Sequence, residues 1–133
     1  MNNYIAMNRF KIVIGKESDF ENIWKNRETF LDGVKGFEKF NLLKGSTNND
    51  HTLYASHSIW TSRSDFENWK RSEAFKKAHS GGGKHQGIYL GHPEFEGFEV
   101  ILWLRNRNSK FSIKILLSQY FDLKILSHFY HIF

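Results

Sequence analysis

The chain has 133 residues, 40% of them hydrophobic and 25% charged, which is typical of one folded domain with its own core rather than of a disordered chain. It contains no cysteine, and this excludes a disulfide framework, a thiolate metal site and a cysteine nucleophile. Aromatic residues reach 17%, and such large, stiff side chains suit a core, an aromatic-lined pocket or a subunit interface.

The net charge of +5 comes mostly from the C-terminal end of the chain. Residues 102–133 hold five basic residues and one acidic residue, which leaves 14 basic and 13 acidic residues in the rest. Because the charges of residues 1–101 nearly cancel and are interleaved, we expect no nucleic-acid binding by the folded body. No signal-peptide core and no run of roughly 18 apolar residues is found, so we expect a cytoplasmic protein that does not use a membrane.

The first strand is predicted from Tyr4 to Ile14, where residues alternate between two faces. Gly15 ends this strand, and Ser18 with Glu21 has the spacing of a capping box at a helix start. A helix is expected from Asp19 to Leu31, since it places four apolar residues at helical intervals: Phe20, Ile23, Trp24 and Leu31.

The next segments predict a hairpin followed by helical pieces. Two strands are expected, Phe37–Lys44 and Thr52–Trp60, with a polar turn over Gly45–His51. Ser64 has capping-box spacing before an apolar helical stripe, and Ser72 is suited to cap a second short helix that ends near the following glycines.

A flexible break at residues 81–83 and an irregular loop to Pro93 lead to a fourth predicted strand, Phe95–Leu102. The predicted order is β-α-β-β-α-β, which indicates an α+β fold of the ferredoxin-like class with a single domain over residues 1–102. Helices on one face of the sheet leave the other face bare, so we expect a homodimer. Residues 103–133 form a C-terminal extension of unknown role, either an added helix or a tail.

Three residues are candidates for a functional site: Asn8, Trp69 and His79. Asn8 lies on the apolar face of the first strand, where its amide needs a backbone partner or a ligand. Trp69, at helical spacing, is most simply a core residue. His79 is at a helix C-terminus beside the glycines and is most simply a surface or capping residue, although a neutral imidazole there can ligate iron.

The segments around these residues resemble the antibiotic biosynthesis monooxygenase superfamily. The resemblance covers about Tyr4 to Ile101, and it is carried by Asn8-Arg9-Phe10, by Phe66-Glu67-Asn68-Trp69 and by the run from Ser72 to His79. Within the superfamily the chain is most similar to the heme-degrading (IsdG-type) branch. In that branch an Asn on the first strand, a Trp on the second helix and a His ten positions after the Trp form the site.

The resemblance implies a dimeric α+β barrel that opens the porphyrin of heme oxidatively and releases iron. His79 would then be the proximal ligand of the heme iron, Asn8 would donate a hydrogen bond on the distal side, and Trp69 would press the macrocycle out of plane. Phe66 and Phe75, from the same motifs, are expected to contact heme. Heme would be both cofactor and substrate, with O2 and an external electron donor supplied by an unidentified reductase.

Three alternatives stay open at the level of the sequence. One is a cofactor-independent monooxygenase of the same superfamily that oxidises a quinol-like aromatic substrate, although the position of His79 argues against it. The second is a non-catalytic heme-binding protein that uses His79 but leaves heme intact. The third is a small dimeric interaction module without a cofactor.

Overall fold

The computed structural model describes residues 2–80 and 87–106. The predicted break at 81–83 and most of the C-terminal extension lie outside the described residues. The chain divides into two units, residues 1–101 and 102–133, and every helix and strand described below belongs to the first. None of the described helices is long and apolar enough to cross a membrane.

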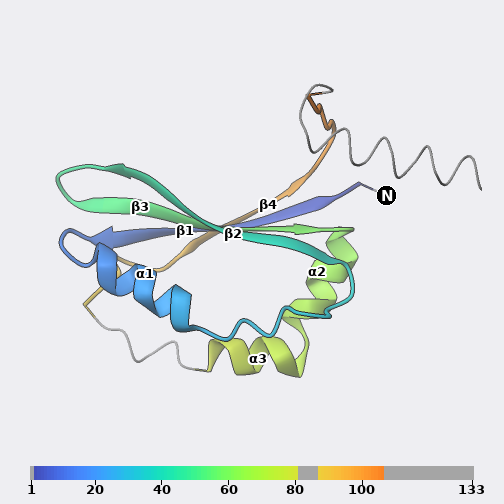
Figure 1. Ribbon diagram of the computed structural model, residues 1–133, viewed down its shortest axis with the longest axis horizontal. Helices are drawn as coiled ribbons and strands as arrows, with labels where there is room; N and C mark the ends of the chain where they lie inside the picture. The colour runs from blue at the N-terminus through green and yellow to red at the C-terminus, as the bar shows by residue number, and fades with distance from the viewer. Residues whose placement is uncertain (1, 81–86, 107–133) are drawn as a thin grey trace, which may run out of the picture. The chain divides into compact units, whose positions relative to one another are not determined.

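The first unit is an antiparallel sheet with helices on one face (Figure 1). In chain order the elements are β1 (Tyr4–Val13), α1 (Glu17–Asn26), β2 (Phe37–Thr47), β3 (His51–Trp60), α2 (Arg63–Lys70), α3 (Glu73–His79) and β4 (Glu94–Glu99). The strands lie in the order β2-β3-β1-β4. This arrangement confirms the predicted α+β, ferredoxin-like fold.

Alternation along β1 and β3 determines which side chains face the helices. Tyr4, Ala6, Phe10 and Ile12 are buried on the helix side of β1, as period-2 burial requires. Asn8 interrupts this buried row and is only half-buried. The pairing of β1 with β3 places it directly opposite Ser56.

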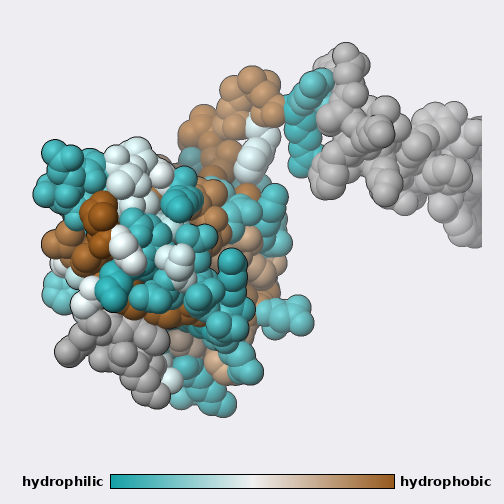
Figure 2. All heavy atoms as spheres, turned by 60° about the vertical axis from the view of Figure 1, so that its left-hand side comes forward, coloured by the Kyte–Doolittle hydropathy of each residue, from teal (hydrophilic) through white to brown (hydrophobic). Residues whose placement is uncertain are grey.

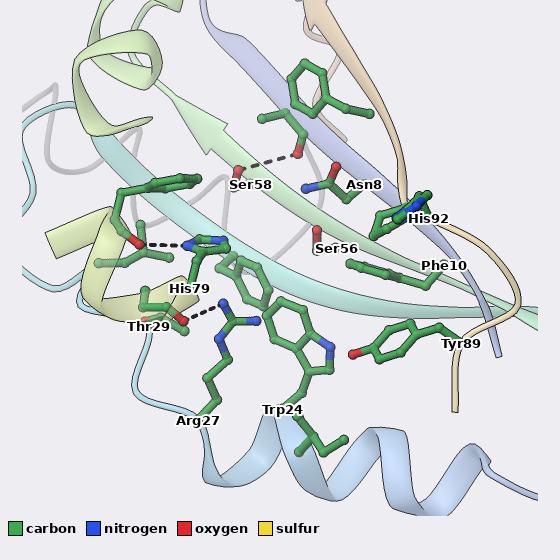
Figure 3. Close-up of a pocket in the computed structure, with 18 of the residues that line it drawn as sticks. Asn8, Phe10, Trp24, Arg27, Thr29, Ser56, Ser58, His79, Tyr89 and His92 are labelled. Atoms are coloured by element: carbon green, nitrogen blue, oxygen red, sulfur yellow. Dashed lines mark hydrogen bonds between the residues drawn. The ribbon is translucent and has the colours of Figure 1, made fainter. Parts of the chain in front are cut away.

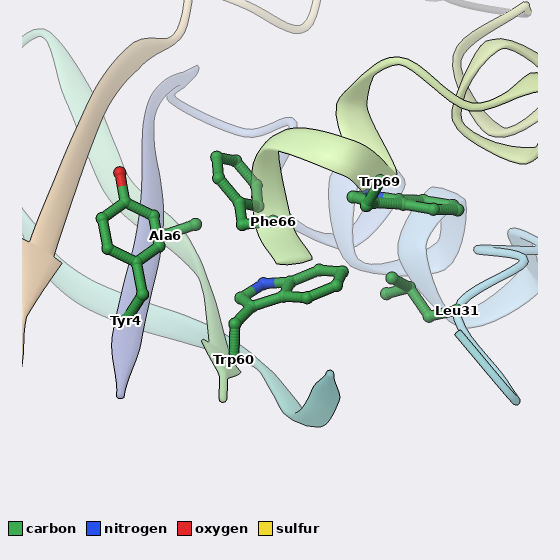
Figure 4. Close-up of a cluster of buried hydrophobic side chains, with 6 residues drawn as sticks. All are labelled: Tyr4, Ala6, Leu31, Trp60, Phe66 and Trp69. Carbon is green, nitrogen blue, oxygen red and sulfur yellow. The ribbon is translucent and has the colours of Figure 1, made fainter. Parts of the chain in front are cut away.

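Two apolar clusters fill the space under the helices. The first lies under α2 and comprises Tyr4, Ala6, Leu31, Trp60, Phe66 and Trp69 (Figure 4). The second lies under α1 and comprises Phe10, Ile12, Phe20 and Tyr54. These aromatic side chains meet in tilted, stacked or edge-on pairs, such as Phe20 with Tyr54 at 4.7 Å between ring centroids. The clusters fix the sheet and helices around the site between them.

The first helix is shorter than predicted, because α1 ends at Asn26 rather than at Leu31. Arg27, which follows it, adopts an extended backbone, and Phe30 has a left-handed φ of 56° that no helix accepts. Leu31 is nonetheless buried in the first cluster, but a loop brings it there. The apolar spacing therefore predicted the burial of Leu31 correctly, but it predicted too long a helix for α1.

The helix caps differ from two of the three expectations. α1 begins after Lys16 without a side-chain cap, and the N-cap of α2 is Ser62, whose hydroxyl accepts from the Asp65 N–H, rather than Ser64. Ser72 caps α3 as predicted, by accepting from the Phe75 N–H at 3.1 Å. Ser62 is the N-cap instead of Ser64, because its extended backbone places its hydroxyl at the first turn of α2.

The strand ends also differ from the sequence-based expectation. β2 continues to Thr47, since Asn48 closes a tight turn by accepting from the N–H groups of Asp50 and His51. β4 runs over Glu94–Glu99 rather than Phe95–Leu102. Side chains from Ile101 to Leu104 are exposed, so the apolar run there does not extend the strand.

The sheet face opposite the helices is formed by the side chains that alternate with the helix-facing ones along each strand. It presents apolar side chains around an ion pair between Arg9 and Glu96: Ile5, Met7, Leu43, Leu53, Ala55, Ile59 and Phe98. No described helix lies on this face in Figure 1. By contrast, the side of the domain seen in Figure 2 mixes hydrophilic and hydrophobic residues.

Candidate functional site

A large cavity of about 1410 Å³ lies between the sheet and the helices (Figure 3). Its volume exceeds the roughly 300–1,000 Å³ of ordinary small-molecule pockets. The cavity contacts all five residues expected from the sequence to bind a cofactor: Asn8, Phe66, Trp69, Phe75 and His79. Residues from β1, β3, all three helices and the 87–95 segment surround it, so one ligand can touch every layer of the domain.

The sheet supplies the polar floor of this cavity. Asn8 from β1 and Ser56 from β3 are cross-strand partners, and both side chains are drawn on the cavity floor in Figure 3. Ser58 lies two residues further along β3, but its hydroxyl is already used, since it accepts from Trp60 Nε1 at 2.9 Å. Asn8 was predicted from the sequence, whereas Ser56 was not.

His79 occupies the last residue of α3, on the helix side of the cavity. Its Nδ1 lies 2.8 Å from the Phe75 carbonyl oxygen, which can only accept, so Nδ1 carries the proton of the neutral ring. The imidazole also stacks on the Phe75 ring at 3.9 Å between centroids. Nε2 is therefore the nitrogen left to act as an acceptor or a metal ligand.

The environment of His79 favours its neutral form. Although the residue as a whole is exposed, desolvation of the ring against its neighbours lowers the pKa of His79 below its ordinary value. The hydrogen bond to the Phe75 carbonyl acts in the opposite direction, and the positive charge of Arg27 lowers the pKa further. A neutral imidazole at pH 7 is the state that a metal ligand requires.

Trp69 belongs both to the core and to the cavity wall. It is buried, stacks on Trp60 at 6.4 Å between centroids, and meets Phe75 edge-on at 5.7 Å. Phe66 contributes to the same wall and stacks on Phe95 at 5.6 Å. The structural and the functional interpretations of Trp69 are thus compatible, because one ring face packs on the core while the residue still borders the cavity.

Arg27 borders the cavity and was not predicted from the sequence. It follows α1, and its Nη2 donates to the Ala78 carbonyl oxygen at 2.7 Å, next to His79. Its guanidinium carbon also lies 4.7 Å from the centroid of the Trp24 ring. The guanidinium therefore brings a fixed positive charge to the cavity, which suits an anionic group on a ligand.

Trp24 and Tyr89 close the α1 end of the cavity. Burial raises the pKa of Tyr89, with Arg27 opposing the shift, so its phenol stays protonated at neutral pH. Trp24 Nε1 is buried and has no hydrogen-bond partner among the described residues. Tyr89 reaches this place because the backbone around it bridges to Ile12 of β1, and no periodic pattern in the sequence predicted that bridge.

Within residues 2–80 and 87–106, no group of three or more His, Cys, Asp or Glu side chains could hold a metal ion. His79 is therefore not part of such a protein-only metal cage among these residues. The cavity lining includes an aromatic wall, the His79 imidazole on the helix side, the Asn8 amide and the Ser56 hydroxyl on the sheet side, and the Arg27 guanidinium. Further polar residues that border it are Asp19, Asn22, Asn26, Thr29, Ser58, Lys70 and His92. This arrangement fits a large, flat aromatic ligand that carries an anionic group.

The fold and the cavity define a small α+β protein with a ligand-sized cavity between an antiparallel sheet and the helices on one face. The sequence profile of the antibiotic biosynthesis monooxygenase family matches residues 3–81, and the chain belongs to this family. The match supports an oxidoreductase of the monooxygenase type.

Solved structures with the same fold are only distantly similar in sequence. A Bacillus cereus protein assigned to antibiotic biosynthesis monooxygenases has a TM-score of 0.63 at 16% identity, over 80% of this chain and 100% of that one. The heme degrader MhuD from Mycobacterium tuberculosis, with two hemes bound in its active site, has a TM-score of 0.60 at 22% identity, over 77% and 99%. SnoaB from Streptomyces nogalater, a cofactor-independent oxygenase, has a TM-score of 0.58 at 18% identity, over 80% and 100%.

Proposed function

We propose that the protein is a heme-degrading monooxygenase that opens the porphyrin with O2 and an external electron donor. The observation that carries this proposal is His79. Its Nδ1 is held by the Phe75 carbonyl, its Nε2 is available, and it borders the same cavity as Asn8 and Trp69. The heme degrader MhuD shares the fold of this chain at 22% identity, so this fold can accommodate the proposed substrate.

The cavity residues fit heme in shape and in charge. The volume of about 1410 Å³ and the aromatic lining accommodate a large planar ring. Arg27 is suited to pair with a propionate carboxylate, because its guanidinium borders the cavity and stays charged. When bound, heme supplies the iron at which O2 reacts and is itself the molecule oxidised.

Each of the three central residues has a separate task in this proposal. His79 ligates the iron through Nε2, and the hydrogen bond at Nδ1 fixes the ring's tautomer and orientation. Asn8 donates a hydrogen bond from the sheet side of the ring. Trp69 presses on the porphyrin from a rigid position, because its indole stacks on Trp60 and meets Phe75 edge-on.

The test is a titration of hemin into the purified protein, followed by visible absorption and then by ascorbate in air with catalase present. We expect a saturable Soret shift that decays to the spectrum of an opened tetrapyrrole. His79→Ala should abolish this decay, whereas His51→Ala, at the start of β3 and away from the cavity lining, should not. Undiminished turnover in His79→Ala would rule the proposal out, and stable binding without decay would identify a heme-binding protein instead.

A second candidate function is cofactor-independent oxidation of a quinol-like aromatic substrate. The observation that favours it is the cluster of Arg27, Tyr89 and Trp24 at one end of the cavity, which could hold a substrate anion without iron. SnoaB, with a TM-score of 0.58, is a cofactor-independent oxygenase. Failure of hemin to bind, together with O2 uptake on a dihydroxynaphthalene, would favour this second function.

We also propose that the protein acts as a homodimer in the cytoplasm, where a reductase supplies its electrons. The apolar sheet face around Arg9 and Glu96 has no covering helix in the described part of the chain. A second copy of the same face would remove its apolar side chains from water.

A further inference from the structure

We propose that Ser56 is a second hydrogen-bond donor on the sheet side of the cavity, acting on the same ligand atom as Asn8. This inference rests on the proposed function and deepens it. It makes Ser56 a catalytic residue that touches the reacting face of the substrate. Strand register, burial and the hydrogen bonds of the β3 hydroxyl groups support this role.

Strand register brings the two side chains together. Asn8 and Ser56 are directly paired between β1 and β3, and both belong to the helix-facing row of their strands. Directly opposed residues in an antiparallel pair have Cβ atoms about 4.5–5.5 Å apart. Both border the cavity, so a single ligand atom above the pair is within reach of both.

The other hydroxyl groups in this row of β3 are already used inside the protein. Thr52 donates to Glu17 at 2.9 Å, Tyr54 donates to Glu21 at 2.8 Å, and Ser58 donates to the Ala6 carbonyl oxygen at 3.4 Å. Ser56 is only 7% exposed, yet its hydroxyl makes no hydrogen bond with any residue that the structure describes. The same is true of the Asn8 amide within residues 2–80 and 87–106.

Among the described residues, only Trp24 Nε1 and His57 Nδ1 are fully buried without a hydrogen-bond partner, so the unpaired Ser56 hydroxyl opens to the cavity rather than into closed core. Alanine at this position would fill nearly the same space and would remove no hydrogen bond within the described part of the protein. The fold therefore gives no reason for a hydroxyl at position 56. A ligand in the cavity does, since it would give the donor an acceptor on the face opposite His79.

The test compares Ser56→Ala with Ser64→Ala, an exposed serine of α2 that does not line the cavity. Three quantities are measured: hemin affinity, turnover with ascorbate, and the C–O stretching frequency of the ferrous carbon monoxide complex, which reports donors near the bound ligand. For Ser56→Ala we expect unchanged thermal stability, hemin affinity within about threefold, a changed stretching frequency, and turnover reduced about 3- to 10-fold, the equivalent of one neutral hydrogen bond.

The double variant Asn8→Ala, Ser56→Ala tests whether the two side chains donate to the same ligand atom or to two different atoms. If both side chains donate to one ligand atom, the combined loss of turnover should differ from the product of the two single losses. Heme degradation with an unchanged stretching frequency and rate in Ser56→Ala would overturn this inference alone. Absence of heme binding in the unsubstituted protein would overturn the proposed function and, with it, the role given to Ser56.

Discussion

The guanidinium of Arg27 donates a 2.7 Å hydrogen bond to the carbonyl of Ala78, the residue immediately before His79. This bond joins the end of α1 to the end of α3 across a span of 51 residues. It also brings a permanent positive charge near the imidazole, and that charge disfavours a second positive charge on His79. Arg27 thus affects both the position and the protonation of the proposed iron ligand.

Arg27→Met is therefore expected to shift the pH dependence of heme binding. Because the pKa of His79 is lowered in part by Arg27, the unsubstituted protein should keep a neutral ligand to a pH below the ordinary histidine value of about 6.5. Removing the cation should raise the pKa of His79, so protons compete with iron at a higher pH. A titration of the Soret band between about pH 5 and 8 measures the midpoint.

Arg27→Lys is the matched control, since it keeps the charge but loses the planar guanidinium. We expect its midpoint to stay closer to that of the unsubstituted protein, while its hemin affinity falls if the bond to Ala78 positions α3. An identical midpoint in Arg27→Met and in the unsubstituted protein would contradict the electrostatic part of this account.

Asn8→Ala should separate binding from reaction. The side chain lies on the sheet and is not the proposed iron ligand, so hemin affinity should change little. Loss of its donor should lower turnover by about 10-fold or more, as expected when an interaction is made mainly in the transition state. Single-turnover decay of the Soret band is the measurement, and equal losses of affinity and of rate would argue against a donor role.

Trp69 should be needed for stability as well as for reaction. Trp69→Ala removes a buried indole that packs on Trp60 and Phe75, and we expect a loss of about 3–5 kcal/mol in the free energy of unfolding. Trp69→Phe keeps part of the packing and should be destabilised less, which makes it the variant in which turnover can be interpreted. Urea denaturation measures the free energy of unfolding of both variants. An unchanged value for Trp69→Ala would show that the core tolerates the loss of the indole.

A charged residue on the open sheet face should disrupt the proposed dimer. Ile5 and Ile59 are cross-strand partners on the side away from the helices. Ile59→Lys would place a charge inside a paired interface, so sedimentation velocity should show monomers for this variant and dimers for the unsubstituted protein. A monomeric unsubstituted protein would contradict the homodimer directly.

The sequence predicted the elements of the fold better than their limits. Period-2 alternation predicted β1 and β3, because burial of one face places apolar residues at every second position of the sequence. Leu31 shows the weakness of helical spacing, since an apolar side chain can be delivered to the core by a loop as well as by a helix. Arg27, the residue after α1, has an extended backbone and a hydrogen-bond partner 51 residues away, and local sequence patterns do not contain such long-range information.

The candidate site could be predicted only in part. Asn8, Trp69 and His79 were found from family resemblance, and all three border one cavity. Ser56 required the register of β1 against β3, which periodicity does not determine. Had the register been known, the position of Ser56 opposite Asn8 would have been the signal that identified it.

The short helix α3 has no buried residue, yet it carries His79. Such a segment has few apolar contacts to lose, so its local opening should cost far less free energy than unfolding of the sheet. Its backbone amides are therefore expected to exchange with deuterium sooner than those of β1 and β3. A bulky, rigid molecule could then reach the interior by a brief detachment of this helix of about two turns, while the strands of the sheet remain intact.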